Sequence, residues 1–213
     1  MKKVRIGGGA GYAGDRIDPA IKLIEEGKLD YIIFECLAER TIGLAKQKML
    51  KDSSKGYSRL LEYRMSQVLK VAKENNVKII SNMGAVNPKG AVKKIMEIAQ
   101  EQGLHGIKFA YVTGDDAYDR VQEHYDDEIF EFPGKVGDYQ DRIVSANAYI
   151  GAAGIMEALK NGAEVIITGR VSDPTLTVAP LCYEYGWTIE ENPIELGQCV
   201  LAGHLIECGG QVT

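Results

Sequence analysis

Several features common in other classes of protein are missing from this 213-residue sequence. It has no run of 18 apolar residues, and Met1–Ile6 carries two lysines but is followed by glycines rather than by an apolar stretch. The sequence therefore predicts neither membrane insertion nor a secretory signal peptide. The cysteines form no CxxC pair, so we expect reduced thiols in a cytoplasmic protein. They are Cys36, Cys182, Cys199 and Cys208.

Signature motifs are also missing. We find no GxxxxGK[ST], no GxSxG and no HExxH, which excludes a P-loop NTPase, a hydrolase nucleophile elbow and a zincin. The net charge of −5 argues against a nucleic-acid partner, because phosphate neutralisation needs a basic surface. The hydrophobic fraction of 45% is nevertheless sufficient for a globular core.

Short β-branched runs alternate with longer segments of helical period. The expected strands are Val4–Ile6, Asp30–Glu35, Val77–Ser81, Ile107–Thr113 and Glu164–Thr168. Near-continuous apolar runs are typical of parallel strands covered on both faces. We predict one α/β domain over residues 1–213, with a Rossmann-like open, mostly parallel sheet of about five strands and helices on both faces. A closed eight-stranded barrel would need three more units than the sequence contains.

Apolar residues at helical spacing define the core faces of the predicted helices. The predicted stripes are Ala38, Ile42, Ala45 and Met49; Leu61, Met65, Val68 and Ala72; and Val92, Ile95, Met96 and Ala99. A further helix is expected over Ile143–Leu159. Four Asx-Pro pairs predict helix starts at Asp18, Asn87, Asp173 and Asn192. Gly27, Gly103 and Gly162 are expected just after helix ends.

The glycine-rich segment 7–14 follows the first expected strand. Gly9, Gly11 and Gly14 spell G-x-G-x-x-G, and Glu35 ends the second strand at a distance that suits a ribose contact. A dinucleotide site is one interpretation, but the helix start at Asp18 and the nearby carboxylates disfavour bound phosphate. A plain strand-to-helix turn is another. So many glycines favour a loop that a ligand approaches closely.

Polar residues follow the other strands. Glu35 is either a general base or metal ligand paired with Glu39, or a charge that complements a helix dipole. Asn82 is a candidate donor to a ligand oxygen, and Asn87 is a candidate ligand residue that also suits a helix cap.

The last two strands add charged candidates. Arg170 suits a carboxylate or phosphate ligand, although an ion pair with Asp173 or Asp115 explains it equally well. Asp115 is a candidate for proton transfer. Glu35, Asp115 and Arg170 are thus the predicted catalytic residues, and Gly9, Gly11, Gly14, Asn82 and Asn87 the predicted ligand contacts.

No metal site is predicted. Acidic residues at the strand ends suit Mg²⁺, but no spacing signature supports it. Cys199 and Cys208 point to opposite sides of a helix, although His204 shares a face with Cys208. The sequence does not identify a cofactor.

Residues 115–141 carry ten acids and two bases, a net charge of −8, with interleaved aromatic residues and Pro133-Gly134. Long connections in compact domains are usually functional or disordered. We therefore expect either a lid or a docking surface here, and a solvated irregular excursion is the alternative.

Taken together, these loops resemble the amino-terminal part of the acyclic terpene utilisation family (AtuA-like proteins). The resemblance is carried by RIGGGAGYAGDRIDPA, FECLAERT, SNMGAVNPKGA, VTGDD, TGRVSDPTL and GHLIECGGQVT. It implies a longer full-length protein and a place in bacterial breakdown of citronellol- and geraniol-type terpenes, alongside acyl-CoA carboxylase subunits. It assigns no reaction to any residue.

Three functions remain open at this point. The first is a catabolic enzyme acting on a small carboxylate or acyl-CoA-type ligand at the carboxyl edge of the sheet. The second is a non-catalytic subunit or scaffold that forms a homo-oligomer or docks an acyl-CoA carboxylase-type partner. The third is a nicotinamide-dependent oxidoreductase.

Overall fold

The computed structural model describes residues 2–212, with side chains described for residues 2–210. Five parallel strands form an open sheet in the order β1-β2-β3-β5-β4. This confirms the predicted open α/β fold. The strands are β1 (Ile6–Ala10), β2 (Tyr31–Phe34), β3 (Lys78–Ser81), β4 (Phe109–Val112) and β5 (Val165–Thr168).

Seven α-helices and three short 3₁₀ helices connect and follow the described strands. The α-helices are α1 (Asp18–Glu26), α2 (Glu39–Lys51), α3 (Leu61–Glu74), α4 (Pro88–Glu101), α5 (Ala153–Lys160), α6 (Thr175–Tyr185) and α7 (Pro193–Cys208). The 3₁₀ helices are η1 (Tyr118–His124), η2 (Val136–Arg142) and η3 (Gly209–Val212). Within residues 2–212, none of the helices combines the length and the apolar character that a bilayer crossing requires.

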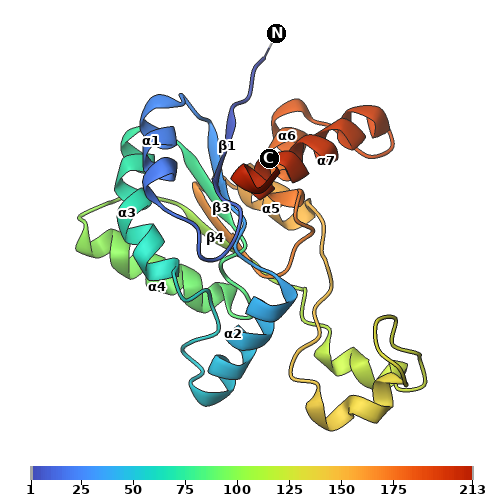
Figure 1. The fold of residues 1–213 in the computed structure, drawn as a ribbon. Helices are drawn as coiled ribbons and strands as arrows, with labels where there is room; N and C mark the ends of the chain where they lie inside the picture. Colours follow the sequence, from blue (N-terminus) through green and yellow to red (C-terminus); the bar gives the residue numbers. More distant parts are fainter. Residues whose placement is uncertain (1, 213) are drawn as a thin grey trace.

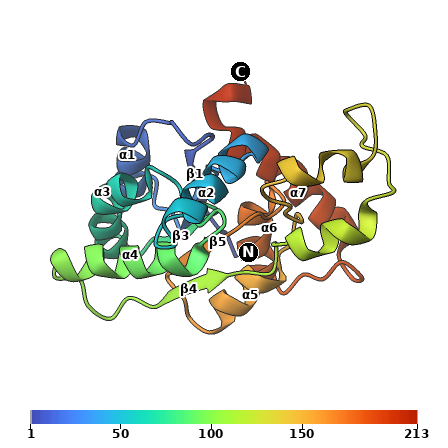
Figure 2. The same cartoon turned by 90° about the horizontal axis from the view of Figure 1, so that it is seen from below.

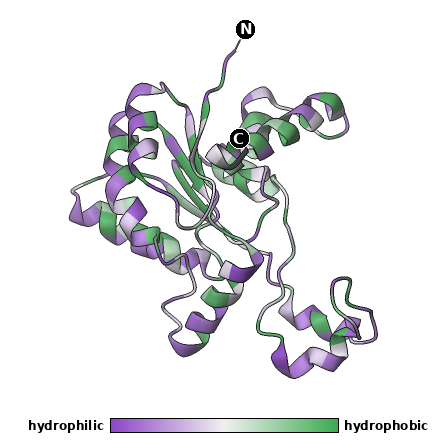
Figure 3. Ribbon diagram, viewed as in Figure 1, coloured by the Kyte–Doolittle hydropathy of each residue, from purple (hydrophilic) through white to green (hydrophobic). Residues whose placement is uncertain are grey.

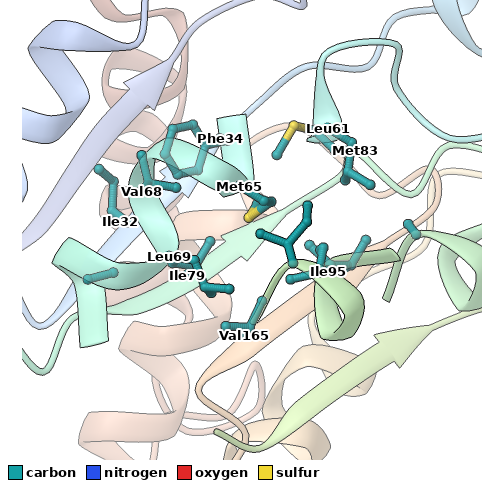
Figure 4. Packing of buried hydrophobic residues seen from close by; sticks show 14 of the residues in the cluster. Ile32, Phe34, Leu61, Met65, Val68, Leu69, Ile79, Met83, Ile95 and Val165 are labelled. Atoms are coloured by element: carbon teal, nitrogen blue, oxygen red, sulfur yellow. The ribbon is translucent and has the colours of Figure 1, made fainter. Parts of the chain in front are cut away.

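The sheet separates two hydrophobic cores. One face packs against α1, α3 and α4, and the other against α5, α6 and α7 (Figure 1). Alternate residues of each strand enter alternate cores, as the pleat requires. Figure 4 shows the first core, in which side chains from β2, β3 and β5 meet those of α3 and α4. Its labelled members are Ile32, Phe34, Leu61, Met65, Val68, Leu69, Ile79, Met83, Ile95 and Val165.

The predicted stripes are confirmed on α3, where all four residues are buried, and corrected on α4, where Met96 is 52% exposed.

The glycine run is corrected as well. It was expected as a loop after a strand, but Gly7, Gly8 and Gly9 lie within β1 itself. Glycine inside a strand marks a close approach of neighbouring atoms. Here Leu23, the backbone of α7 and Phe34 occupy the space that side chains would need.

Helices begin at or within two residues of all four Asx-Pro pairs. The Asx side chain caps its helix only at α4, where Asn87 Oδ1 accepts a hydrogen bond from Gly90 N at 2.9 Å. Asp18 lies within α1 and Asp173 lies before α6, and each carboxylate binds an arginine instead of a helix amide. Asn192 precedes α7 without a side-chain cap bond. Gly27 directly follows α1, as predicted, but its φ of −76° is not the positive value expected of a glycine at a helix end.

The helix expected over residues 143–159 begins only at Ala153. The preceding backbone is engaged elsewhere. Asn147 forms a bridge with Asp116 and Ile150 with Val171, and Ser172 N donates to Ile150 O at 3.1 Å. These non-helical hydrogen bonds hold residues 147–150 as the extended return from the segment before it.

Residues 117–146, which we call the acidic lobe, extend away from the sheet near α2 (Figures 1 and 2). Ala117 N donates to Ala146 O at 2.9 Å, so the two ends of the lobe meet at its base. Neither η1 nor η2 contains a buried residue, and the lobe carries both hydrophobic and hydrophilic residues along its length (Figure 3).

Candidate functional site

Most of the buried polar side chains gather where the strands end. Those at the carboxyl ends of β2, β3, β4 and β5 and on adjoining helices are Glu35, Ser81, Asn82, Asp115, Thr168, Arg170, Thr175 and Glu207. β3 and β5 are neighbours, but the helices that follow them, α4 and α6, cover opposite faces of the sheet. Such a switch point opens a crevice at the carboxyl edge, which is where ligands bind in open α/β sheets.

Glu35 and Asn82 form the centre of this cluster. Phe34 pairs with Ser81 in the sheet, so the residues that follow them leave adjacent strands side by side. Asn82 Nδ2 donates to Glu35 Oε1 at 2.7 Å, and Asn82 Oδ1 accepts from Cys36 N at 2.8 Å. The completely buried Asn82 amide therefore binds the residues after β2 through both its nitrogen and its oxygen.

The environment of Glu35 favours its protonated form. The residue is 8% exposed, and burial raises the pKa of its carboxyl group. Hydrogen bonds from Asn82 and from Leu37 N oppose this shift, whereas the charges of Asp173 and Glu207 add to it. A carboxyl group with a raised pKa suits general acid–base chemistry.

Arg170 is 3% exposed and bound on several sides. Its guanidinium donates to Leu37 O and pairs with Asp173 Oδ1 at 2.6 Å. Its backbone N donates to Asp115 Oδ2 at 2.8 Å. This is the ion-pair arrangement that the sequence left open beside a ligand-binding role. A contact between Arg170 and a ligand stays a prediction.

Asp115 and Tyr149 complete the surroundings of Arg170. Asp115 Oδ2 also accepts from Asn147 Nδ2 at 3.0 Å, so it ties together the strand ends and the return segment. The Tyr149 ring lies 3.9 Å from the Arg170 guanidinium carbon, and its hydroxyl donates to Glu39. These contacts fix the base of the acidic lobe against α2.

The predicted carboxylate pair does not share a helix. Glu35 is buried before α2 begins, whereas Glu39 is exposed in its first turn. The hydrogen bond from Tyr149 lowers the pKa of Glu39, which is the opposite direction from Glu35. The two carboxyl groups therefore have different chemical characters despite their spacing of four residues.

The glycines expected to approach a ligand mostly approach protein. A Cβ on Gly8 would lie 2.5 Å from Ile206 O, and one on Gly11 would lie 2.5 Å from Cys208 O. Both oxygens belong to the backbone of α7. Gly9 faces the ring of Phe34 instead. Gly14 differs, because it lines a cavity.

This cavity of about 220 Å³ lies between the segment after β1, the segment after β2, α2, and the loop before α3. Its lining is mostly apolar, with two cations and no acidic residue among the described residues. The lining residues are Ala13, Gly14, Cys36, Leu37, Thr41, Leu44, Ala45, Lys48, Tyr57, Ser58, Arg59, Leu60 and Ala85. The sequence does not predict this cavity, because it specifies no position of α2 relative to the loop before α3.

Arg64 of α3 is a second buried arginine that the sequence analysis missed. It is fully buried behind the cavity wall. Its NH1 contacts Cys36 Sγ at 2.9 Å, and its NH2 donates to Asp15 O at 2.7 Å. A signal was present in the sequence, since a charged residue at position 64 interrupts the apolar stripe that begins at Leu61.

Two other predicted sites lie apart from this cluster. Asn87 caps α4 and donates to Lys55 O at 2.8 Å, so it binds the loop 53–55 rather than the strand ends. Near the end of α7, His204 Nδ1 lies 3.4 Å from Glu207 Oε1, and Cys208 Sγ lies 3.3 Å from the same oxygen. Among the described residues, no group of His, Cys, Asp and Glu has the arrangement of a metal site.

Comparison with known proteins identifies the family. Residues 4–213 match the family described as "Acyclic terpene utilisation family protein AtuA", and the chain belongs to this family. No curated protein matches the chain. No solved structure matches it either.

Proposed function

We propose that this member of the acyclic terpene utilisation family is a catabolic enzyme that acts on a small branched acid or its acyl-CoA ester at the carboxyl edge of the sheet. The observation that carries the proposal is the arrangement at the end of β2. Glu35 is a buried carboxyl with a raised pKa, and the next two residues, Cys36 and Leu37, line an apolar cavity. The proton-transfer group thus directly precedes, along the chain, two residues that line a space suited to an apolar chain.

In the proposed reaction, Glu35 takes a proton from the carbon next to the substrate carbonyl group, the electron pair of the broken C–H bond moves onto the carbonyl oxygen, and the proton then returns to the carbon as that electron pair re-forms the C–H bond. The Glu35 side chain faces the α6 and α7 side, where Asp173 and Glu207 raise its pKa, whereas Cys36 belongs to the core beneath α3. The proposal requires a ligand that crosses the end of β2 and reaches both sides of the sheet. Asn82 orients the Glu35 carboxyl group, and Arg170 with Asp115 positions Leu37 and the return segment.

Solvent exchange tests this proposal. The chain is incubated in D₂O with geranyl-CoA, citronellyl-CoA or citronellate, and deuterium in the recovered compound is measured by mass spectrometry. Incorporation is expected with wild type and is expected to fall at least about a hundredfold in Glu35→Gln, since a general base typically contributes that much or more. Glu39→Gln is the matched control and should exchange normally. Equal exchange by wild type and Glu35→Gln would refute the role of Glu35.

A specific observation favours a second candidate, a docking subunit. Phe130 is fully exposed and Phe132 is 62% exposed on the acidic lobe. Exposed aromatic residues two positions apart on a strongly charged arm suit contact with another protein. Sedimentation of the chain with and without residues 118–145 tests this alternative, which requires that an oligomer or complex depend on the lobe.

The nicotinamide alternative draws no support from the glycines. The backbone of α7 explains the lack of side chains at Gly8 and Gly11. A pyrophosphate bound at a dinucleotide fingerprint would have to approach these glycines as closely as α7 does. The space that it would need is therefore already taken by α7.

A further inference from the structure

The two buried arginines among the described residues differ in how their charges are balanced. Arg170 pairs with Asp173 Oδ1 at 2.6 Å. Arg64 has no carboxylate oxygen within 4.0 Å among the described residues. It is fully buried, and its Nε has no hydrogen-bond partner. Burying a cation without a counter-charge is strongly unfavourable, so a charge that goes unmatched in this way calls for an explanation.

The neighbours of Arg64 are neutral. NH1 donates to Ala13 O at 3.3 Å and contacts Cys36 Sγ, and NH2 donates to Asp15 O. Burial raises the pKa of the Cys36 thiol to about 12, although Arg64 acts in the opposite direction. Cys36 is therefore an uncharged thiol at neutral pH. The Asp15 carboxylate is itself held by Gly11 N and Arg16 N, at 3.0 and 2.8 Å.

The groups around Arg64 also form a wall of the cavity. Ala13 and Cys36 touch the guanidinium on one side and line the cavity on the other. Two further cations, Lys48 and Arg59, line the same cavity, and neither has an ion-pair partner in the described part of the chain. The cavity is thus apolar in most of its lining, with two cations on its surface and Arg64 behind its wall, while the charges of Glu35 and Asp15 also act on Cys36.

We infer that this cavity binds the free carboxylate form of a branched, apolar acid, and that Arg64 supplies the buried positive charge that selects it. The inference rests on the proposed function and names its ligand class. The volume of about 220 Å³ is below the roughly 300–1,000 Å³ of typical ligand pockets, so it suits a small acid rather than a whole CoA ester. The Arg64 charge attracts the carboxylate across the cavity wall, without touching it. Arg64 is therefore a specificity residue rather than a catalytic one.

A buried cation and an exposed cation respond differently to salt. Exposed cations such as Lys48 and Arg59 are screened by salt, whereas a buried charge is screened much less. Selection for an anion by Arg64 should therefore survive high ionic strength. Selection by Lys48 and Arg59 alone should be lost at high ionic strength.

Citronellate and citronellol test the inference, because they share one carbon skeleton and differ in charge. Binding of each to the chain is measured by titration calorimetry at 0.05 and 0.5 M KCl (about 14 and 4 Å of screening length). Wild type is expected to bind citronellate about tenfold more tightly than citronellol at both salt concentrations. Arg64→Met should bind the two equally, and Arg64→Lys should retain the preference.

Lys48→Gln/Arg59→Gln is the control variant and should keep the preference of about tenfold for citronellate over citronellol at both salt concentrations, because Arg64 is still present. Equal affinities in wild type, a preference that vanishes at 0.5 M KCl, or a preference retained in Arg64→Met would overturn the inference. If Arg64→Met does not fold, the wild-type comparison at high salt and Arg64→Lys decide the matter. Binding of citronellyl-CoA without citronellate would refute this inference alone, whereas binding of none of the three would refute the proposed function as well.

Discussion

Alanine at Gly11 should disturb the packing of α7 on β1 even when no ligand is present. The added Cβ would lie 2.5 Å from Cys208 O and 2.8 Å from the Cys208 carbonyl carbon. Both are backbone atoms, so they cannot rotate away as a side chain would. Overpacking of this kind costs about 1–3 kcal/mol, which exceeds the roughly 0.4–1 kcal/mol gained by restricting the unfolded chain. A net loss of about 1–2 kcal/mol in the free energy of unfolding is expected.

Gly197 provides a matched control within α7, the helix that packs against Gly11. It lies within α7, and a Cβ there would meet nothing within 4 Å. Alanine is favoured over glycine in a helix interior by about 0.5–1 kcal/mol. Gly197→Ala should therefore stabilise the chain, whereas the same substitution at Gly11 destabilises it.

Urea unfolding followed by circular dichroism measures both changes without any ligand. For a chain of this size, each kcal/mol corresponds to about 2–4 °C in Tm, so melting curves provide a second measurement. If Gly11→Ala were as stable as wild type while Gly197→Ala gained stability, α7 would not be the reason for the glycine. Close approach of a ligand would then be the better explanation of the glycine-rich segment.

Further changes test other parts of the structure. Asn87→Ala should lower the free energy of unfolding by about 1 kcal/mol through loss of the α4 cap, and an unchanged urea midpoint would contradict that role. The pKa of Glu35 is raised by burial, so its contribution to stability is present below the unfolded value of about 4.3 and is lost as pH rises through the folded pKa. Wild type should therefore lose stability relative to Glu35→Gln from acid to neutral pH, and the opposite trend is expected for Glu39, whose pKa is lowered. Replacing residues 118–145 by a short Gly-Ser linker should change Tm by only a few degrees, because neither η1 nor η2 contains a buried residue, and a collapse of Tm would show that the lobe supports the fold.

The sequence was sufficient for the architecture because hydrophobic period is a local property. The continuous apolar runs of β2 and β5 predicted buried parallel strands, and the stripe on α3 predicted its core face. The errors arose where tertiary contacts replaced local preferences. The glycines of β1 look like a loop until α7 is placed over them, and Asp173 looks like a helix cap until Arg170 is placed beside it.

The candidate site was predictable to the extent that it depends on strand ends. Glu35 and Asn82 end neighbouring strands, so their meeting follows from a parallel sheet, and they form a hydrogen bond. The cavity depends instead on how α2 and the loop before α3 sit at the edge of the sheet. No periodicity in the sequence specifies that arrangement.

The two arginines show why exposure and charge balance identify an anion site better than position in a motif. Arg170 follows a strand end, where ligands are expected, yet Asp173 and the carbonyl of Leu37 already use its guanidinium. Arg64 lies inside a helix, where a sequence pattern indicates packing, yet its charge is matched only by neutral acceptors. An anion gains more from a cation whose field is not already cancelled, particularly where burial removes screening by water. On this reasoning the carboxylate belongs beside the Ala13 and Cys36 wall, where the Arg64 charge lies behind the lining.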